Sequence, residues 1–376
     1  MKNKPNIIFL MIDQLRADRL DSFQIFQDLK QEGVFFPNMV TYAPYTVASV
    51  HAILTGMYGC RNGVDSYYGN LDFDADNCMT LQQYLLGQGY YTKADVLSKI
   101  ILPAQGFSEI TVHDEYKDNL ALRHKDMIKE AGTRAPFFLF FQYSNIHTGI
   151  ISQVVNKFTD DDKEYFHQTD RNLERYDGFV AQAGRYLREI IDLISNDNAL
   201  RDTLIVVLTD HGCSLGEKPG EKCYGVFVYD YTVMTFAYFI YNSLLPKARQ
   251  VNALVRTIDI MPSLMAMLGI EQKEGFKKMQ GESFYDGIEE NRVIDREAYI
   301  ETAPLSGPHP SPNKPNICAY RTKDWKLIYN EATAKRELYD LGSDPQENRN
   351  LSGKSMKVEE ELLNKMSIVS GRIKIN

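Results

Sequence analysis

The chain has 376 residues, a net charge of −8 and an isoelectric point of about 5.5. Hydrophobic residues make up 44% and charged residues 24% of it, which is typical of a globular protein and excludes wholesale disorder or a coiled coil. The acidic balance argues against nucleic acid as the main partner, because binding the phosphate backbone requires a basic face. Five cysteines imply no disulfide framework.

No apolar run reaches the length of about 18 residues that a membrane span needs. The run Ile7–Ile12 follows Lys2 and Lys4, as in a signal peptide, but it is too short, lacks a small-residue cleavage site and ends at Asp13. We therefore expect a cytoplasmic protein without a membrane span, and interpret the run as a buried strand.

Short apolar runs alternate with longer amphipathic stretches in the first two thirds of the chain. The predicted strands are Ile7–Ile12, Pro136–Tyr143, Thr203–Thr209 and Thr235–Tyr241. The predicted helices are Leu81–Gln88, which ends at Gly89, Asn172–Ile194, and Val251–Leu268, which Gly269 would cap. This alternation predicts an α/β fold with a doubly wound, mostly parallel sheet and right-handed crossovers.

The pattern changes after residue 270, where Glu271–Tyr285 is polar and loop-like. Short strand-like pieces then follow, separated by turn residues, and a helix closes the chain. These pieces are Ala298–Glu301, Ile317–Thr322, Trp325–Tyr329 and Glu337–Asp340, and the helix is Val358–Met366. We expect a catalytic α/β domain at 1–275 and a C-terminal α+β subdomain with a small antiparallel sheet at 276–376.

Acidic and imidazole side chains follow three of the predicted strands. Asp13 directly follows the first strand, Asp210 and His211 directly follow the third, and His147 comes soon after the second. Open α/β sheets bind ligands at the carboxyl ends of their strands, so these groups are expected at one edge. Two aspartates and a histidine form a ligand set for a divalent cation.

The segment Thr46–Gly56 follows a turn and is compatible with a helix. Thr46 would lie at or near its N-cap, where free backbone N–H groups and the helix dipole favour an anion. A hydroxyl at this place, in contact with a metal, could attack phosphorus or sulfur. Ser49, one turn further along, could support the same pocket.

Each of these residues also has a purely structural interpretation. Asp13 could be a turn residue, Thr46 a plain N-cap and His147 a satisfied core histidine. Cys213 and Cys223 with His211 could suggest zinc, although they lack a paired Cys-x-x-Cys spacing.

The order of the pieces resembles the sulfatase family of the alkaline phosphatase superfamily. Seven segments, between about residue 5 and residue 351, are similar to that family and occur in its order. They are PNIIFLMIDQLRADRL, YAPYTVASVHAILTGMYGCRNGV, TLQQYLLGQGYYT, PFFLFFQYSNIHTGI, TLIVVLTDHGCSLGEK, VNALVRTIDIMPSLMAMLGI and ELYDLGSDPQENRNL. The resemblance implies an alkaline-phosphatase-like sheet and a metal-dependent ester hydrolase or transferase.

The resemblance also implies roles for individual residues. The metal ligands it implies are Asp13, Gln14, Thr46, Asp210 and His211. Thr46 matches the nucleophile and His147 the histidine that contacts substrate oxygens. Lys222 or Tyr224 matches the basic position downstream of the second metal strand.

This sequence departs from the family at the nucleophile. The usual C-x-P-S-R is Thr46-Val47-Ala48-Ser49-Val50 here, so the residue at the nucleophile position, Thr46, cannot become formylglycine, and the Pro and Arg are missing. The usual Gly-Lys is replaced by Lys93-Ala94-Asp95-Val96, and Gln14 stands where many members have an acid. A threonine nucleophile resembles the phosphodiesterase and phosphotransferase branches, in which a phospho-threonine forms.

We therefore expect hydrolysis or transfer of a phosphate ester (a phosphodiester, phosphonate ester or phosphomonoester) through Thr46, with His147 and Lys222 as further catalytic residues. Ser49, Tyr224 and His309 are expected to bind substrate, a small molecule or a glycan-linked ester. The expected cofactor is one divalent ion, Mn²⁺, Zn²⁺, Ca²⁺ or Mg²⁺, with room for a second. Two alternatives stay open: a sulfate-ester hydrolase working without formylglycine, and an inactive sulfatase-like binding protein.

Overall fold

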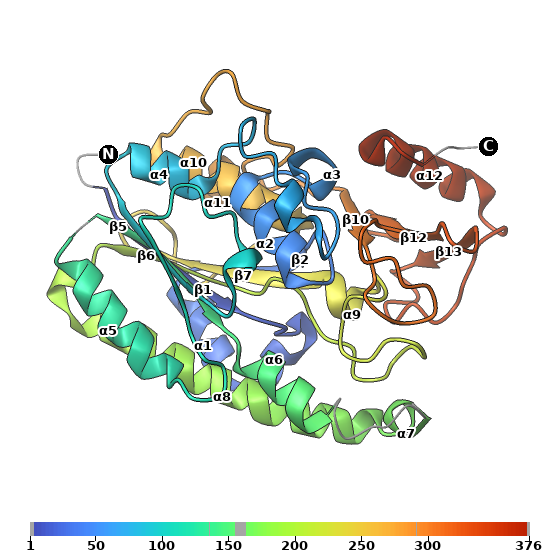
Figure 1. Ribbon diagram of the computed structural model, residues 1–376, viewed down its shortest axis with the longest axis horizontal. Helices are drawn as coiled ribbons and strands as arrows, with labels where there is room; N and C mark the ends of the chain where they lie inside the picture. Colours follow the sequence, from blue (N-terminus) through green and yellow to red (C-terminus); the bar gives the residue numbers. More distant parts are fainter. Residues whose placement is uncertain (1–3, 135, 155–162, 291, 374–376) are drawn as a thin grey trace.

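The computed structural model describes residues 4–134, 136–154, 163–290 and 292–373. A large twisted sheet crosses the molecule with helices on both faces, and a smaller sheet lies beside it near the C-terminus (Figure 1). Within the described residues, the large sheet has the strand order β4-β3-β5-β1-β6-β7-β2-β8, and β9 also pairs with β2. Its strands are β1 Asn6–Ile12, β2 Val34–Val40, β3 Tyr91–Val96, β4 Glu109–Val112, β5 Phe137–Tyr143, β6 Thr203–Leu208, β7 Met234–Ile240, β8 Arg249–Gln250 and β9 Val255–Arg256.

The centre of the sheet is parallel, as the sequence predicts. Strand β1 lies between β5 and β6, with Phe9 in register with Phe140 on one side and Val206 on the other. Strand β7 is the exception, because it runs antiparallel to both β6 and β2. The predicted sheet was mostly parallel, and this strand is an antiparallel exception within it. An apolar run reports burial on both faces but not direction, and the connection from β6 to β7 is mainly an irregular loop rather than a helical crossover.

Alternate side chains of each central strand point into two separate cores. Ile8 and Leu10 belong to the core under one face, and Ile7 and Phe9 to the core under the other. In Figure 1 the lower face is covered by α1 Gln24–Glu32, α5 Leu120–Gly132, α6 Asn145–Gly149 and α8 Thr169–Asn196. The upper face is covered by α2 Thr46–Thr55, α4 Leu81–Gly87, α10 Ile260–Leu268 and α11 Tyr285–Glu290. Shorter helices are α3 Gly59–Asn62, α7 Lys163–Phe166 and α9 Asp230–Val233.

The predicted helix Val251–Leu268 begins later than expected. Its first part instead contains β9, which adds to the sheet edge, and a short 3₁₀ turn at Thr257–Asp259. Helix α10 then runs to Leu268, and Gly269 caps it with φ of 67°, as predicted. The apolar residues before Ile260 are buried in both interpretations, so their spacing alone did not distinguish a strand from a helix.

The C-terminal part forms the predicted antiparallel sheet and closing helix. Its elements are β10 Ala298–Thr302, β11 Ile317–Arg321, β12 Trp325–Asn330, β13 Lys335–Asp340 and α12 Met356–Ser370. One apolar cluster joins Leu362 and Met366 of α12 to Tyr45 and Ala48 at the start of α2, so this subdomain supports the beginning of α2. The division at residue 275 stays a prediction, and Phe284 packs in the core of the large sheet beyond it.

A buried charge cluster also joins the two parts. Lys326 of β12 has a fully buried side chain whose ammonium group lies 2.8 Å from Asp230 and 2.8 Å from Glu347. Arg321 contacts the same aspartate at 2.9 Å. Burial raises the pKa of Glu347 to about 7, while Lys326 opposes this shift.

We expect Lys326→Met to lower the free energy of unfolding by about 3–5 kcal/mol, because it leaves buried carboxylates without their shared cation. Denaturant titration followed by circular dichroism measures this change. Lys323→Met is the matched control, because that side chain is 63% exposed and its pair with Asp295 contributes at most about 1 kcal/mol. Equal stability of the two variants would contradict the prediction.

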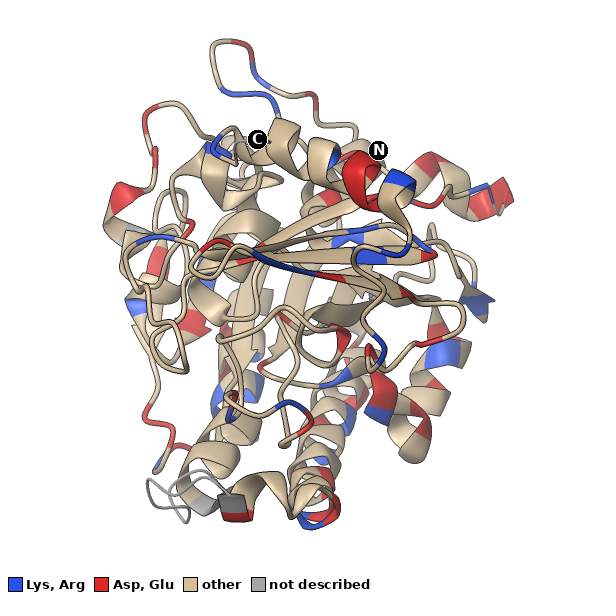
Figure 2. Ribbon diagram, turned by 90° about the vertical axis from the view of Figure 1, so that its right-hand side faces the viewer, with Lys and Arg blue, Asp and Glu red and all other residues tan. Residues whose placement is uncertain are grey.

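The charges of the molecule are dispersed. Figure 2 shows acidic and basic segments interspersed along the ribbon on the side that carries the C-terminal sheet. Within the described residues, no helix is long and apolar enough to cross a membrane. The longest, α8, is amphipathic and buries one face against the sheet.

Candidate active site

The predicted ligands of a cation meet at the carboxyl ends of β1 and β6. Asp13 follows β1 and Asp210 follows β6, so the pairing of these parallel strands brings them together. His211 Nε2 lies 3.8 Å from Asp13 Oδ1 and 3.5 Å from Asp210 Oδ2. All three side chains are almost completely buried. The structure therefore places Asp13, Asp210 and His211 in one group, as the sequence predicts.

The polar atoms of this group fit a divalent cation. Asp13 Oδ1 and Asp210 Oδ2 are buried and have no hydrogen-bond donor among the described residues. His211 Nδ1 lies 2.7 Å from the carbonyl of Gly212, which can only accept, so Nδ1 carries the hydrogen and Nε2 offers a lone pair. Two orphaned carboxylate oxygens and an imidazole lone pair that point into one space form a suitable ligand set.

The electrostatics of Asp13 lead to the same interpretation. The pKa of Asp13 is raised to about 8, mainly by burial and next by the neighbouring Asp210. Gln142 on β5 partly offsets this by donating a hydrogen bond of 2.7 Å to Asp13 Oδ2. Two carboxylates so close in a buried space repel each other unless a cation or a proton lies between them.

Thr46 lies beside this group, at the first residue of α2. Its Oγ1 is 3.3 Å from His211 Nε2. Tyr45 occupies the N-cap and makes no side-chain capping bond, so the first backbone N–H groups of α2 stay available to an anion. The helix is almost entirely buried and ends at Gly56 in the left-handed conformation, which fixes the direction of its N-terminus.

His147 and Tyr224 lie on the side of His211, the residue that contacts Thr46. His147 lies on α6, directly after β5, and its Nε2 is 3.3 Å from the Tyr224 hydroxyl. The Tyr224 ring packs against His211, with ring centroids 4.9 Å apart. Burial lowers the pKa of His147 and raises that of Tyr224. Tyr224 therefore lies between His147 and His211, a predicted ligand of the cation.

Comparison with known proteins decides the family. The family description named Sulfatase matches residues 5–270, and a second, "N-sulphoglucosamine sulphohydrolase, C-terminal", matches residues 222–370. The chain belongs to the sulfatase family. An arylsulfatase of Clostridium perfringens is 32% identical over 124 residues, which is 30% of this chain, and the chain spans only 25% of the length of that protein.

Solved structures confirm the fold of this sulfatase-family chain. A protein solved in complex with its substrate D-glucosamine-2-N,6-O-disulfate aligns with a TM-score of 0.75 and 18% identity over 98% of each chain. A phosphonate monoester hydrolase of Agrobacterium radiobacter aligns with a TM-score of 0.76 and 16% identity over 98% of this chain and 96% of the other. The fold predicted from the resemblance is thereby confirmed.

The other predicted site residues of this sulfatase-family chain are Gln14, Lys222 and His309, and their roles stay predictions. The Gln14 side-chain oxygen faces the Cys223 sulfur at 3.4 Å, and its backbone N–H donates to Asp210, so its role as a ligand stays a prediction. Lys222 is half-buried in the loop before Tyr224. Its catalytic role stays a prediction. His309 follows β10, and its carbonyl accepts a bond from Asn316.

Ser49 is fully buried behind Thr46. Its hydroxyl donates to the carbonyl of Ala43 at 2.6 Å and lies 3.1 Å from the hydroxyl of Thr41, from which it accepts. It thereby holds the turn that leads into α2. Its predicted contact with substrate remains untested.

We expect Ser49→Ala to lower the free energy of unfolding by about 1–3 kcal/mol, because the buried acceptor on Ala43 loses its donor. Thermal unfolding measures the loss. Ser343→Ala is the control, since this hydroxyl is exposed. A melting temperature of the Ser49 variant equal to that of the control would show that the turn does not depend on this bond.

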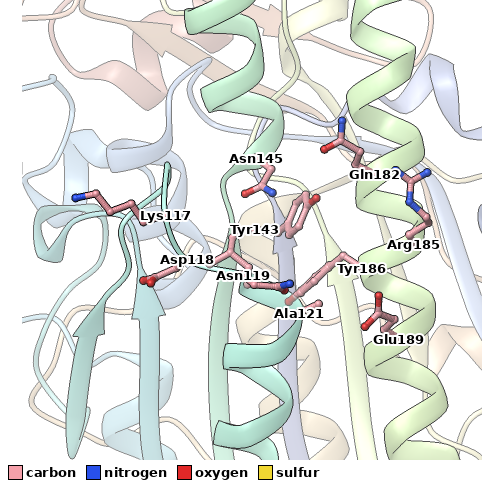
Figure 3. Close-up of a pocket in the computed structure, with 11 residues that line it drawn as sticks. Lys117, Asp118, Asn119, Ala121, Tyr143, Asn145, Gln182, Arg185, Tyr186 and Glu189 are labelled. Atoms are coloured by element: carbon pink, nitrogen blue, oxygen red, sulfur yellow. The ribbon is translucent and has the colours of Figure 1, made fainter.

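Two other features are distinct from the site. A second group, Asp95, His113 and His124, has metal-like spacing, but Arg123 donates to both oxygens of Asp95 at 2.9 and 3.0 Å. A guanidinium in this position repels a cation, so these residues do not fit a second metal. A surface pocket of about 360 Å³ lies beside Asn145, Tyr143, Tyr186 and Arg185 (Figure 3), and none of the groups around Thr46 lines it.

Sequence reasoning missed Gln142 and Glu115. Gln142 is one residue from the end of β5 and orients Asp13, and Glu115 Oε2 lies 3.6 Å from His147 Nδ1. The position of Gln142 at the carboxyl end of a predicted strand was a usable signal. No local pattern marks Glu115, because its partner is far along the chain.

Proposed function

We propose that the protein hydrolyses esters of oxyacids whose reacting group carries a single negative charge, with Thr46 as nucleophile and a divalent cation as cofactor. The observation that supports this most is the group formed by Thr46, His211 and the two orphaned aspartate oxygens. Membership of the sulfatase family supports ester hydrolysis.

In this proposal Asp13, Asp210 and His211 would hold the cation, and the Thr46 hydroxyl, 3.3 Å from His211 Nε2, would be close enough to be activated by it. The cation would lower the pKa of that hydroxyl and polarise an oxygen of the substrate. Thr46 attacks the central phosphorus or sulfur, and the free N–H groups of α2 stabilise the oxygens that become more negative. His147 donates a proton to the departing alcohol, and water then releases Thr46.

The charges around Thr46 favour a singly charged group over a phosphomonoester dianion. The arginine of the usual family motif is replaced by Val50, which is fully buried in an apolar core. Lys93, near the missing family lysine, is 4% exposed and pairs with Glu109 and Glu130 instead. With fewer cations near the anion, a second negative charge would be poorly neutralised.

Among singly charged esters, we rank phosphodiesters and phosphonate monoesters first. A sulfated threonine, unlike a sulfated formylglycine hydrate, has no second hydroxyl on the same carbon whose deprotonation would expel the sulfate. Water must therefore attack the sulfur directly. In the phosphate reaction both attacks are at phosphorus, first by Thr46 on the ester and then by water on the phosphorylated threonine, and the same N–H groups of α2 would serve each step. The fold of a phosphonate monoester hydrolase agrees with this ranking.

Sulfate esters are the second candidate. The family match and the arylsulfatase relative favour them. The sequence also predicts that the segment Ile150–Asp170 shapes the substrate pocket, and residues 155–162 of that segment lie outside the described residues.

A panel of chromogenic esters tests the proposal on the purified protein with Mn²⁺, Mg²⁺, Ca²⁺ or Zn²⁺. Its members are bis(4-nitrophenyl) phosphate, 4-nitrophenyl phenylphosphonate, 4-nitrophenyl sulfate and 4-nitrophenyl phosphate. We expect the first two to be turned over fastest and the last, a dianion, slowest. Faster turnover of the sulfate would favour the second candidate, and no turnover with any metal would favour an inactive binding protein.

A further inference from the structure

The loop after β4 holds both ends of the helix that carries His147. His113 Nε2 lies 2.9 Å from the hydroxyl of Ser144, the residue just before α6. Two residues further, Glu115 Oε2 accepts a hydrogen bond of 2.5 Å from the hydroxyl of Thr148 on α6. This loop comes from an edge of the sheet and contacts α6 through these side chains. It therefore fixes α6 relative to β5.

Glu115 also faces the ring of His147. Its Oε2 lies 3.6 Å from His147 Nδ1, a distance that suits an ion pair better than a hydrogen bond. Nδ1 is buried and has no hydrogen-bond partner among the described residues. On the opposite side of the ring, Nε2 faces the hydroxyl of Tyr224. One nitrogen is thus directed to a carboxylate and the other to the reaction space.

The described titratable groups around His147 are Glu115, Tyr224 and, at longer range, Asp210. Burial lowers the pKa of His147, and Glu115 is the strongest of the opposing influences. Without this carboxylate the buried imidazole would be harder to protonate.

We propose that Glu115 is a positioning residue for His147, holding Nδ1 toward its carboxylate so that the proton on Nε2 faces the leaving group. The inference rests on the proposed function. As the ester bond breaks, its electron pair stays on the leaving oxygen, which takes the proton from Nε2. The ring becomes neutral. Water then attacks the threonine ester, gives its proton to Nε2, and Thr46 leaves as the alkoxide.

Glu115→Gln tests this through the leaving group. A 4-nitrophenolate leaves without a proton, whereas an aliphatic alcohol needs one. The two esters compared have the same reacting group and differ only in the leaving group. We expect the variant to lower kcat/KM at least about tenfold for the benzyl ester and less than about threefold for the 4-nitrophenyl ester. An equal loss for both esters would reduce Glu115 to a structural support and overturn the proposal.

Two control variants separate the causes. Thr148→Val removes the hydrogen bond to Glu115 but keeps the charge of Glu115. We expect this variant to keep the wild-type ratio of kcat/KM between the two esters. Glu189→Gln removes an exposed carboxylate on α8 that pairs with Lys125, and it is expected to change neither ester. A changed ratio in either control would contradict a specific role of Glu115.

A measurement without turnover makes the result independent of the proposed function. Nitrogen-15 NMR of labelled histidines, with His147→Gln for assignment, gives the pKa and tautomer of His147. We expect Glu115→Gln to lower that pKa by about one unit and to reduce the share of the Nδ1–H form of the neutral ring. An unchanged pKa and tautomer would overturn the positioning role. If the wild type hydrolyses no ester, the proposed function fails, and the NMR result still decides for or against Glu115.

Discussion

Thr46→Ala should lower turnover by roughly 10³–10⁶-fold while leaving the fold intact, because the variant lacks the hydroxyl that lies 3.3 Å from His211 Nε2. The side chain is small and lies at the first residue of α2, where alanine is at least as favourable as threonine. Among the contacts of the described residues, the one polar contact of the Thr46 hydroxyl is its approach to His211. Loss of activity without loss of stability is therefore expected.

Two further substitutions test whether the hydroxyl itself reacts. Thr46→Ser keeps a nucleophile and should retain a measurable fraction of the wild-type rate, whereas Thr46→Val keeps the shape and should behave like Thr46→Ala. Initial rates with the best ester of the panel give the comparison, and mass spectrometry of the quenched wild type should detect a phosphorylated or sulfated Thr46. A Thr46→Ala protein with full activity would exclude the nucleophile.

The central part of the site was predictable from the sequence because it depends on strand ends. Uninterrupted apolar runs locate β1 and β6, and the polar residues that follow them must lie at the carboxyl edge once the strands are parallel neighbours. Asp13, Asp210 and His211 are therefore found together. The order of the motifs then predicts Thr46 as the nucleophile, because the helical pattern of α2 is continuous up to Gly56.

The remaining parts depend on contacts that sequence spacing does not encode. The direction of β7 follows from its irregular connection and not from its apolar residues. Lys222 and Tyr224 were equally plausible from spacing, and only the three-dimensional path of the loop places the Tyr224 ring against His211. Glu115 and His147 are brought together by the packing of an edge loop on α6, which no periodic pattern reveals.

The second large effect concerns the metal and pH. In the protein without a cation, burial and Asp210 raise the pKa of Asp13 from 3.8 to about 8. A carboxyl group whose pKa is raised by folding favours the folded state at low pH, and this contribution is fully present below about pH 4. It is lost progressively as the pH rises through about 8, by at most about 1.4 kcal/mol per pH unit.

We therefore expect the melting temperature of the chelator-treated protein to fall between pH 5 and pH 8.5, and a saturating divalent cation to restore it increasingly over the same range. Asp13→Asn removes the buried charge, so the metal-free variant should be more stable than the metal-free wild type at pH 8 and should gain little from added cation. Thermal unfolding across pH measures the wild type and Asp13→Asn, each with and without Mn²⁺.

Chelation should also abolish turnover, and readdition of the cation should restore turnover in the wild type but not in Asp13→Asn. A metal-free wild type that is more stable at pH 8 than Asp13→Asn would show that the two aspartates are not the unpaired charges of the site, because an unpaired buried carboxylate cannot stabilise the folded state relative to its neutral amide.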